Sequence, residues 1–90
     1  MRRVEHEMVR AIRKRKSWRG KNTEVRVYSD LAKVYLFGKH IADYVYGVGT
    51  VVNENTLSQW PTVTTKSRLR ALNVDVYTSR HITYLNGQPV

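Results

Sequence analysis

The ninety-residue sequence contains no cysteine, few acidic residues and no long apolar run. The absence of cysteine excludes disulfide bonds and thiolate-bound zinc, and it is typical of proteins that work in a reducing compartment. No stretch approaches the roughly eighteen apolar residues of a membrane-spanning helix, and the N-terminus lacks the apolar segment of a signal peptide. We therefore expect a protein of the cytoplasm that has no membrane partner.

The scarcity of acidic residues, seven against sixteen Lys and Arg, leaves a net charge of +9. Residues 1–21 hold nine basic and two acidic residues, a net charge of +7, whereas residues 22–90 hold seven and five, a net charge of +2. Positive charge gathered in one segment favours an anionic partner, either nucleic acid (DNA or RNA) or an acidic protein surface.

Residues 2–16 have the periodicity of an amphipathic helix, with Val4, Met8 and Ile12 on one apolar arc. Basic side chains occupy the opposite arc and the last turn, and Gly20 is expected to end the helical segment. Seven basic side chains of this segment are the candidate binding residues for nucleic acid or a protein partner: Arg3, Arg10, Arg13, Lys14, Arg15, Lys16 and Arg19. The alternative interpretation is the solvated face of an ordinary surface helix.

From Asn22 onward the apolar residues alternate with polar ones, which predicts strands. The expected strands cover residues 23–29, 33–37, 40–46, 50–53, 74–78 and 81–85. Gly38-Lys39 fits a type II′ hairpin turn, which favours glycine at its first central position. Asn53–Asn55 is expected to form a polar turn, and residues 86–90 a frayed tail.

A second helix is predicted after Trp60-Pro61, because proline keeps the preceding residue extended and a threonine at 64 or 65 can cap a helix. Its N-terminus is a candidate anion site made of Thr64, Thr65, Lys66 and Arg68, since helix N-termini attract phosphate. The alternative is a simple cap. The expected core consists of Trp60, Leu69, Leu72, Val34, Leu36, Ile41 and Val76.

Three motifs of the chain are similar to those of a known family. The run Trp-x-Thr-x-Thr-Thr-x-x-Arg-Leu at residues 60–69 resembles the signature of a small domain of unknown function that recurs in tailed-phage proteomes. Asn22-Thr23 and the hairpin at residues 34–41 resemble its upstream motifs, and Arg70 departs from the pattern, which has an uncharged polar residue there. The resemblance covers residues 22–85. It implies a phage origin, and hence a location in the host cytoplasm, but no activity.

Residues capable of catalysis or metal binding are scattered. His6, His40 and His81 lack the spacing of zinc ligands, and the carboxylates lack a partner motif for acid–base catalysis. We therefore expect a protein that is not an enzyme and needs no metal or cofactor. The aromatic side chains, including Phe37 and Tyr44, could act as stacking platforms for single-stranded nucleic acid or could cover the edges of the core.

Together these patterns predict one α+β domain over residues 1–90, with a basic helical segment (1–21), a β-rich body (22–85) and a tail (86–90). It would have an N-terminal helix, an antiparallel sheet of about five strands, and a short helix before the last β-hairpin. The favoured function is a phage-encoded accessory protein that binds nucleic acid without sequence specificity through the basic helix face. One alternative is a protein–protein module that binds an acidic surface of a host or phage protein and modulates that protein. Another is a structural role in the virion.

Overall fold

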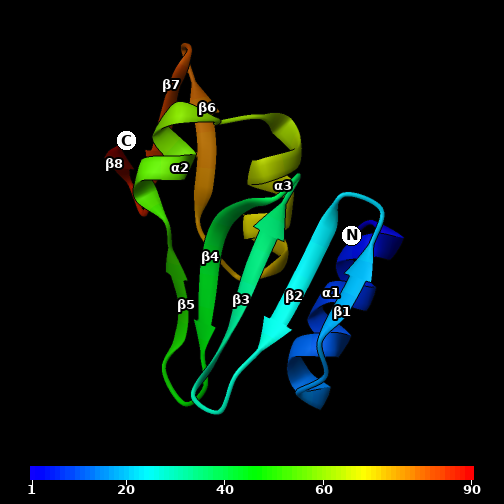
Figure 1. Cartoon of the computed structure of the whole chain (residues 1–90). Coiled ribbons are helices and arrows are strands. Elements are labelled where there is room, and N and C mark those ends of the chain that lie inside the picture. Colours follow the sequence, from blue (N-terminus) through cyan, green and yellow to red (C-terminus); the bar gives the residue numbers. More distant parts are fainter.

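The computed structural model describes residues 1–90, and Figure 1 shows its elements. Their order is α1 (Arg3–Lys14), β1 (Trp18–Gly20), β2 (Thr23–Val27), β3 (Leu31–Leu36), β4 (Lys39–Val45), β5 (Gly49–Val52), α2 (Glu54–Gln59), α3 (Val63–Ala71), β6 (Val76–Ser79), β7 (Ile82–Leu85) and β8 (Gln88–Pro89). The first five strands form an antiparallel sheet in sequence order, and the last three form a second, smaller antiparallel sheet. The predicted α+β class is confirmed.

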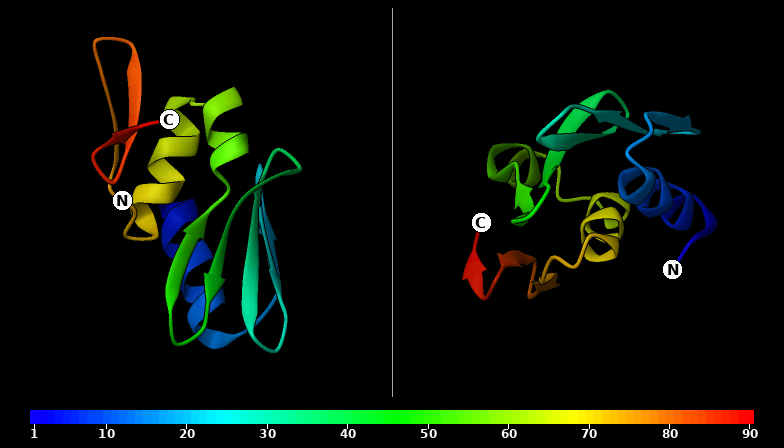
Figure 2. Two further views of the ribbon diagram at one scale, coloured as in Figure 1. Left: turned by 90° about the vertical axis from the view of Figure 1, so that its left-hand side faces the viewer. Right: turned by 90° about the horizontal axis from the view of Figure 1, so that it is seen from below.

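The helices α1 and α3 pack on one face of the larger sheet, and α3 lies between α1 and the smaller sheet (Figure 2). The register explains why this face is apolar. Val25 pairs with Val34, Val34 with Ala42, and Ala42 with Val52, so one row of small and branched side chains crosses four strands. Alternation sends Lys33 and the other intervening residues of β3 to the opposite face.

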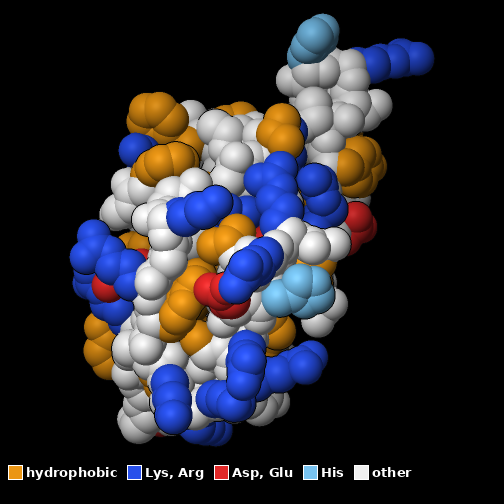
Figure 3. Space-filling model, turned by 90° about the vertical axis from the view of Figure 1, so that its right-hand side faces the viewer, with side chains coloured by type: hydrophobic (Ala, Val, Ile, Leu, Met, Phe, Trp, Pro, Cys, Tyr) orange, Lys and Arg blue, Asp and Glu red, His pale blue; other side chains and the backbone are white.

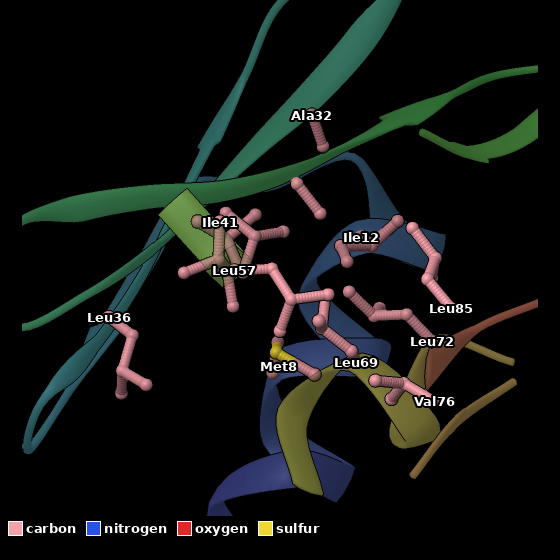
Figure 4. Close-up of a cluster of buried hydrophobic side chains, with 13 residues drawn as sticks. Met8, Ile12, Ala32, Leu36, Ile41, Leu57, Leu69, Leu72, Val76 and Leu85 are labelled. Atoms are coloured by element: carbon pink, nitrogen blue, oxygen red, sulfur yellow. The ribbon is translucent and has the colours of Figure 1, made fainter. Parts of the chain in front are cut away.

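The core beneath the helices contains thirteen buried residues (Figure 4). They are Met8, Ile12, Val25, Ala32, Val34, Leu36, Ile41, Ala42, Leu57, Leu69, Leu72, Val76 and Leu85. Six of the seven predicted core residues are buried, and Trp60 is the exception. Trp60 terminates α2 and remains 49% exposed, while Leu57 of the same helix takes the core position with 1% exposure.

Helix α1 ends earlier than predicted. Arg15 adopts the left-handed conformation (φ 55°) just after the helix, and the N–H groups of Arg15 and Lys16 donate to the carbonyls of Ile12 and Ala11. Gly20 does not stop the helix, because it belongs to β1, where the indole of Trp18 lies over its α-carbon and leaves no room for a side chain. Trp18–Gly20 therefore adds an edge strand that periodicity did not reveal.

Two turns also differ from the predictions. Because Leu36 pairs with Lys39, the β3–β4 turn is formed by Phe37-Gly38, and both residues have positive φ (51° and 76°), as a type I′ turn requires. Asn86-Gly87 has the same signature (φ 51° and 82°) and returns the chain to pair β8 with β7. Residues 86–90 are therefore part of the smaller sheet and not a frayed tail.

The segment between the two sheets is more helical than predicted. Asn53 does not begin a polar turn. Its side chain accepts a hydrogen bond from the N–H of Thr56 (3.1 Å), which caps the six-residue helix α2. Helix α3 begins at Val63 and is capped by Thr62, whose Oγ1 accepts from the N–H of Thr65 (3.1 Å). The cap is thus two or three residues earlier than predicted.

Candidate nucleic-acid interface

A buried ion pair fixes the N-terminal half of α1 to α3. Glu5 and Arg68 are 2% and 3% exposed, and the guanidinium Nη1 of Arg68 donates to Oε2 of Glu5 at 2.7 Å. Ser67 donates to the same oxygen (2.5 Å), and the backbone N–H of Arg2 donates to the other one (3.0 Å). Both oxygens of the carboxylate therefore accept hydrogen bonds from the protein itself.

The remaining donors of Arg68 reach the β1–β2 turn. Its Nε donates to Oγ1 of Thr23 (3.0 Å) and its Nη2 donates to Oδ1 of Asn22 (3.2 Å). One guanidinium, with its five N–H donors in a planar fork, thus joins the Asn22-Thr23 motif to the run at residues 60–69. The structure corrects the placement of Arg68, which was expected at a surface anion site and instead holds three elements together.

The hydrogen-bond donors around Glu5 determine the protonation state of its carboxyl group. Burial by itself raises the pKa of Glu5, but the hydrogen bonds from Ser67, from the Arg2 backbone and from Arg68 outweigh burial and hold that pKa below its usual value. Glu5 is therefore the ionised partner of Arg68 at neutral pH. Sequence reasoning missed this acid, although its place three and seven residues before Met8 and Ile12 puts it on the buried stripe of the helix.

A second contact fixes the C-terminal end of α1. The hydroxyl of Tyr46 donates to the carbonyl of Ile12 (2.6 Å), and the guanidinium of Arg15 lies 3.7 Å from the centre of the Tyr46 ring. Burial raises the pKa of Tyr46, so this phenol is a donor across the ordinary pH range. The helix is therefore held at both ends and presents its outer face as a rigid surface.

Four of the seven predicted binding residues lie on this outer face, namely Arg3, Arg10, Arg13 and Lys14. Arg15, Lys16 and Arg19 follow between the helix and the end of β1, and all seven are exposed. In Figure 3, Lys and Arg side chains cover much of the face formed by α1 and β1. Only Arg3 has a carboxylate partner, Glu7, at 3.3 Å, and the Arg3 side chain is 94% exposed. Arg10, Arg13 and Lys14 have none, so the protein's own carboxylates leave most of the charge of this face unneutralised.

The residues of the second candidate site are not gathered at the surface. Thr65 is buried and its hydroxyl bonds to that of Thr62, Lys66 donates to the hydroxyl of Thr78, and Arg68 is committed to Glu5. Thr64 is half-buried. The N-terminus of α3 is therefore a capped helix end whose neighbouring side chains are already engaged, which favours the alternative interpretation of these four residues.

Three adjoining depressions mark the end of the molecule where the β1–β2 and β3–β4 turns meet the helices. The first, of about 540 Å³, lies between the start of α1 and β1, the second, of about 430 Å³, between the two turns, and the third, of about 270 Å³, between the β3–β4 turn and the α2–α3 junction. The basic and aromatic residues that line them are Arg2, Arg3, Trp18, Arg19, Lys21, Phe37, Lys39, Trp60 and Arg68.

The aromatic side chains divide into two groups. Tyr44 and Tyr46 contact each other edge to face (5.5 Å between centroids) and pack against the core, and Tyr35 lies beneath the guanidinium of Arg26. Phe37 and Trp60 are 69% and 49% exposed. Tyr28 and Tyr77 are also exposed, at 50% and 43%, but of these four side chains only Phe37 and Trp60 line the depressions.

These features define a small basic α+β protein with a rigid cationic helix face. The chain belongs to the Kyanoviridae Gp96 protein family, a family of phage proteins, with a match that spans residues 1–90. No curated protein matches the chain, and neither does any solved structure. The match supports the phage association that the sequence motifs implied, and its range includes α1, which supplies the partner of Arg68.

Metal-binding clusters and membrane-spanning helices are absent from the structure. No group of three or more His, Cys, Asp or Glu side chains lies close enough together to hold a metal ion. None of the three helices has both the length and the apolar character needed to cross a bilayer.

Proposed function

We propose that this phage protein acts in the host cytoplasm as an accessory protein that binds nucleic acid without base specificity and has no catalytic activity. The observation that supports it is the unneutralised cation row on α1, a helix whose two ends are fixed to the body. Phosphates are the sequence-independent part of nucleic acid, and Lys and Arg neutralise them with release of counterions.

The length of α1 sets the scale of the contact. Twelve residues at 1.5 Å each make a helix of about 18 Å. At about 3.4 Å per base pair, that length lies along about five base pairs, which is enough for about four phosphate contacts. Arg3, Arg10, Arg13 and Lys14 are the residues that make them.

The test is the salt dependence of binding to labelled random-sequence oligonucleotides. With about four contacts, log K should fall with log salt at a slope of about −3.6 on duplex DNA. The double substitution Arg10→Gln and Arg13→Gln should make that slope shallower by about 1.8 and weaken binding to all sequences alike. A matched control, Lys33→Gln with Arg80→Asn, removes the same charge from the far face of the sheet and from a hairpin tip, and should leave the slope unchanged.

The outcome also decides between the two partner classes. An acidic protein surface would be attracted by the same cations. Absence of binding to duplex and to single strands at low salt, together with a stoichiometric host or phage protein that is released by the Arg10/Arg13 variant, would replace the nucleic-acid proposal with the protein–protein one.

A further inference from the structure

The three depressions at the turn end of the molecule form one continuous track. Lys21 and Asn22 line both the first and the second depression, and Phe37 lines both the second and the third. Lys21 and Asn22 belong to the β1–β2 turn and Phe37 to the β3–β4 turn, and Figure 1 shows these two turns at the same end of the larger sheet. The backbone N–H of Phe37 donates to the carbonyl of Asn22 (2.7 Å), which fixes the two turns against each other.

The charges along this track are predominantly positive. Arg2, Arg19, Lys21 and Lys39 have no carboxylate partner. The two acids in the lining, Glu7 and Glu24, are each paired with an arginine. A negatively charged chain lying in the track would therefore meet unneutralised cations along its whole length.

Phe37 is an aromatic residue in a backbone conformation that other residue types adopt with less strain. It stands at a central position of a type I′ turn with φ 51°, where glycine, asparagine and aspartate are the residues of low strain. Its ring is 69% exposed, so burial does not compensate for the strain. Strain and exposure together in one aromatic residue point to a role in contact with something outside the chain.

Trp60 provides the second exposed ring. The Nζ of Lys39 lies 4.4 Å from the centre of its indole, so a cation is held beside an aromatic face at the same depression that Phe37 lines. This combination of a ring for a base and an ammonium for the neighbouring phosphate is the one by which proteins bind single strands. A duplex cannot use it, since its bases are stacked on one another.

We infer that the track binds single-stranded nucleic acid, with bases stacked on Phe37 and Trp60 and phosphates on Lys21 and Lys39. The inference rests on the proposed function, because it takes nucleic acid as the partner. It adds a preference for the single strand and a second contact surface beyond the face of α1. An acidic peptide is the competing occupant, and the test separates the two.

The test compares a labelled single strand of mixed sequence with the duplex of the same sequence. Phe37→Leu and Trp60→Leu should each weaken binding to the single strand by roughly 5- to 150-fold, the effect of losing one stacked base, and leave duplex binding unchanged. Tyr28→Leu is the matched control, because Tyr28 is 50% exposed and lines none of the three depressions. A second readout is tryptophan fluorescence, which the single strand should quench more strongly in the wild-type protein than in Trp60→Leu, where Trp18 is the remaining tryptophan.

Each outcome has a separate meaning. If both ring variants bind the single strand as the wild-type protein does, while Arg10→Gln/Arg13→Gln weakens both forms, stacking in the track is overturned and the proposed function stands. If the wild-type protein binds neither form at low salt, the proposed function fails and this inference fails with it. Binding of poly-glutamate that depends on Phe37 and Trp60 would then assign the track to an acidic protein segment.

Discussion

At the scale of single residues, Arg68 has the most demanding environment in the protein. Arg68 is 3% exposed, so its guanidinium has lost its hydrating water. An opposite charge and hydrogen-bond acceptors from the protein must take the place of that water. Glu5 supplies the charge, while Asn22 and Thr23 supply the remaining acceptors. No buried side-chain polar atom is left without a partner. The pair therefore specifies one way of packing α1 onto α3 and the β1–β2 turn.

The first prediction at this scale concerns Glu5. Glu5→Gln keeps the shape but removes the charge, and it should lower the free energy of unfolding by about 3 kcal/mol, since it leaves Arg68 buried without a counterion. Glu7→Gln on the same helix should cost less than about 1 kcal/mol, because its arginine partner is exposed. Urea unfolding followed by circular dichroism measures both. Equal midpoints for the two variants would contradict the structural role assigned to Glu5.

The pH dependence of stability provides a second prediction. The pKa of Glu5 is lowered in the folded protein, so the unfolded chain binds a proton at a higher pH than the folded one does. The stabilisation is therefore complete above the ordinary glutamate pKa of about 4.3 and is lost as the pH falls through the lower folded value. The difference in unfolding free energy between wild type and Glu5→Gln should be largest at neutral pH and shrink in acid. A difference that is constant from neutral to acidic pH would show that Glu5 does not titrate in this way.

At the scale of elements, most of the helices and strands were predictable, including short strands such as β5 and β7, whereas β1, α2 and β8 were not. Helix α1 and strands β2 to β4 have enough residues for their period to be read from the sequence, and each was placed within a few residues. Helix α2 has six residues, fewer than two turns, and its polar sequence matches a turn equally well. Its formation moved Leu57 into the core and left Trp60 at the surface, a consequence that no local pattern encodes.

One part of the candidate site was predictable from the sequence and another part was not. The cations of α1 could be named from the sequence because they are neighbours along one helix. The track could not, since it depends on two turns and a helix junction meeting in space, and Arg68 looked like a surface cation until its partner Glu5, sixty-three residues away, was placed beside it. Like the position of Glu5, the Asn86-Gly87 turn had a signal in the sequence, since Asn-Gly is a strong marker of a hairpin.

At the scale of the whole molecule, the basic segment and the β-rich body share one hydrophobic core. Residues 1–21 hold most of the net charge, which suggests an appendage, yet they also provide Met8 and Ile12 to the core and Glu5 to the buried pair. The basic side chains and the buried apolar side chains lie on opposite faces of α1. Removal of α1 would therefore affect both binding and folding.

The last prediction follows from that arrangement: a chain of residues 22–90 should not fold. Burial of Met8 and Ile12 contributes about 1.5–3 kcal/mol each, and leaving Arg68 without Glu5 costs about 3–5 kcal/mol more. The sum is comparable with the entire stability of a ninety-residue domain, at roughly 0.05–0.15 kcal/mol per residue. The truncated chain should therefore show the narrow amide NMR dispersion of an unfolded polypeptide. Full-length Arg10→Gln/Arg13→Gln, which keeps the apolar face of α1, should retain the wild-type spectrum outside the altered turn. A well-dispersed spectrum from residues 22–90 would show that the body folds alone and that α1 is an added binding arm.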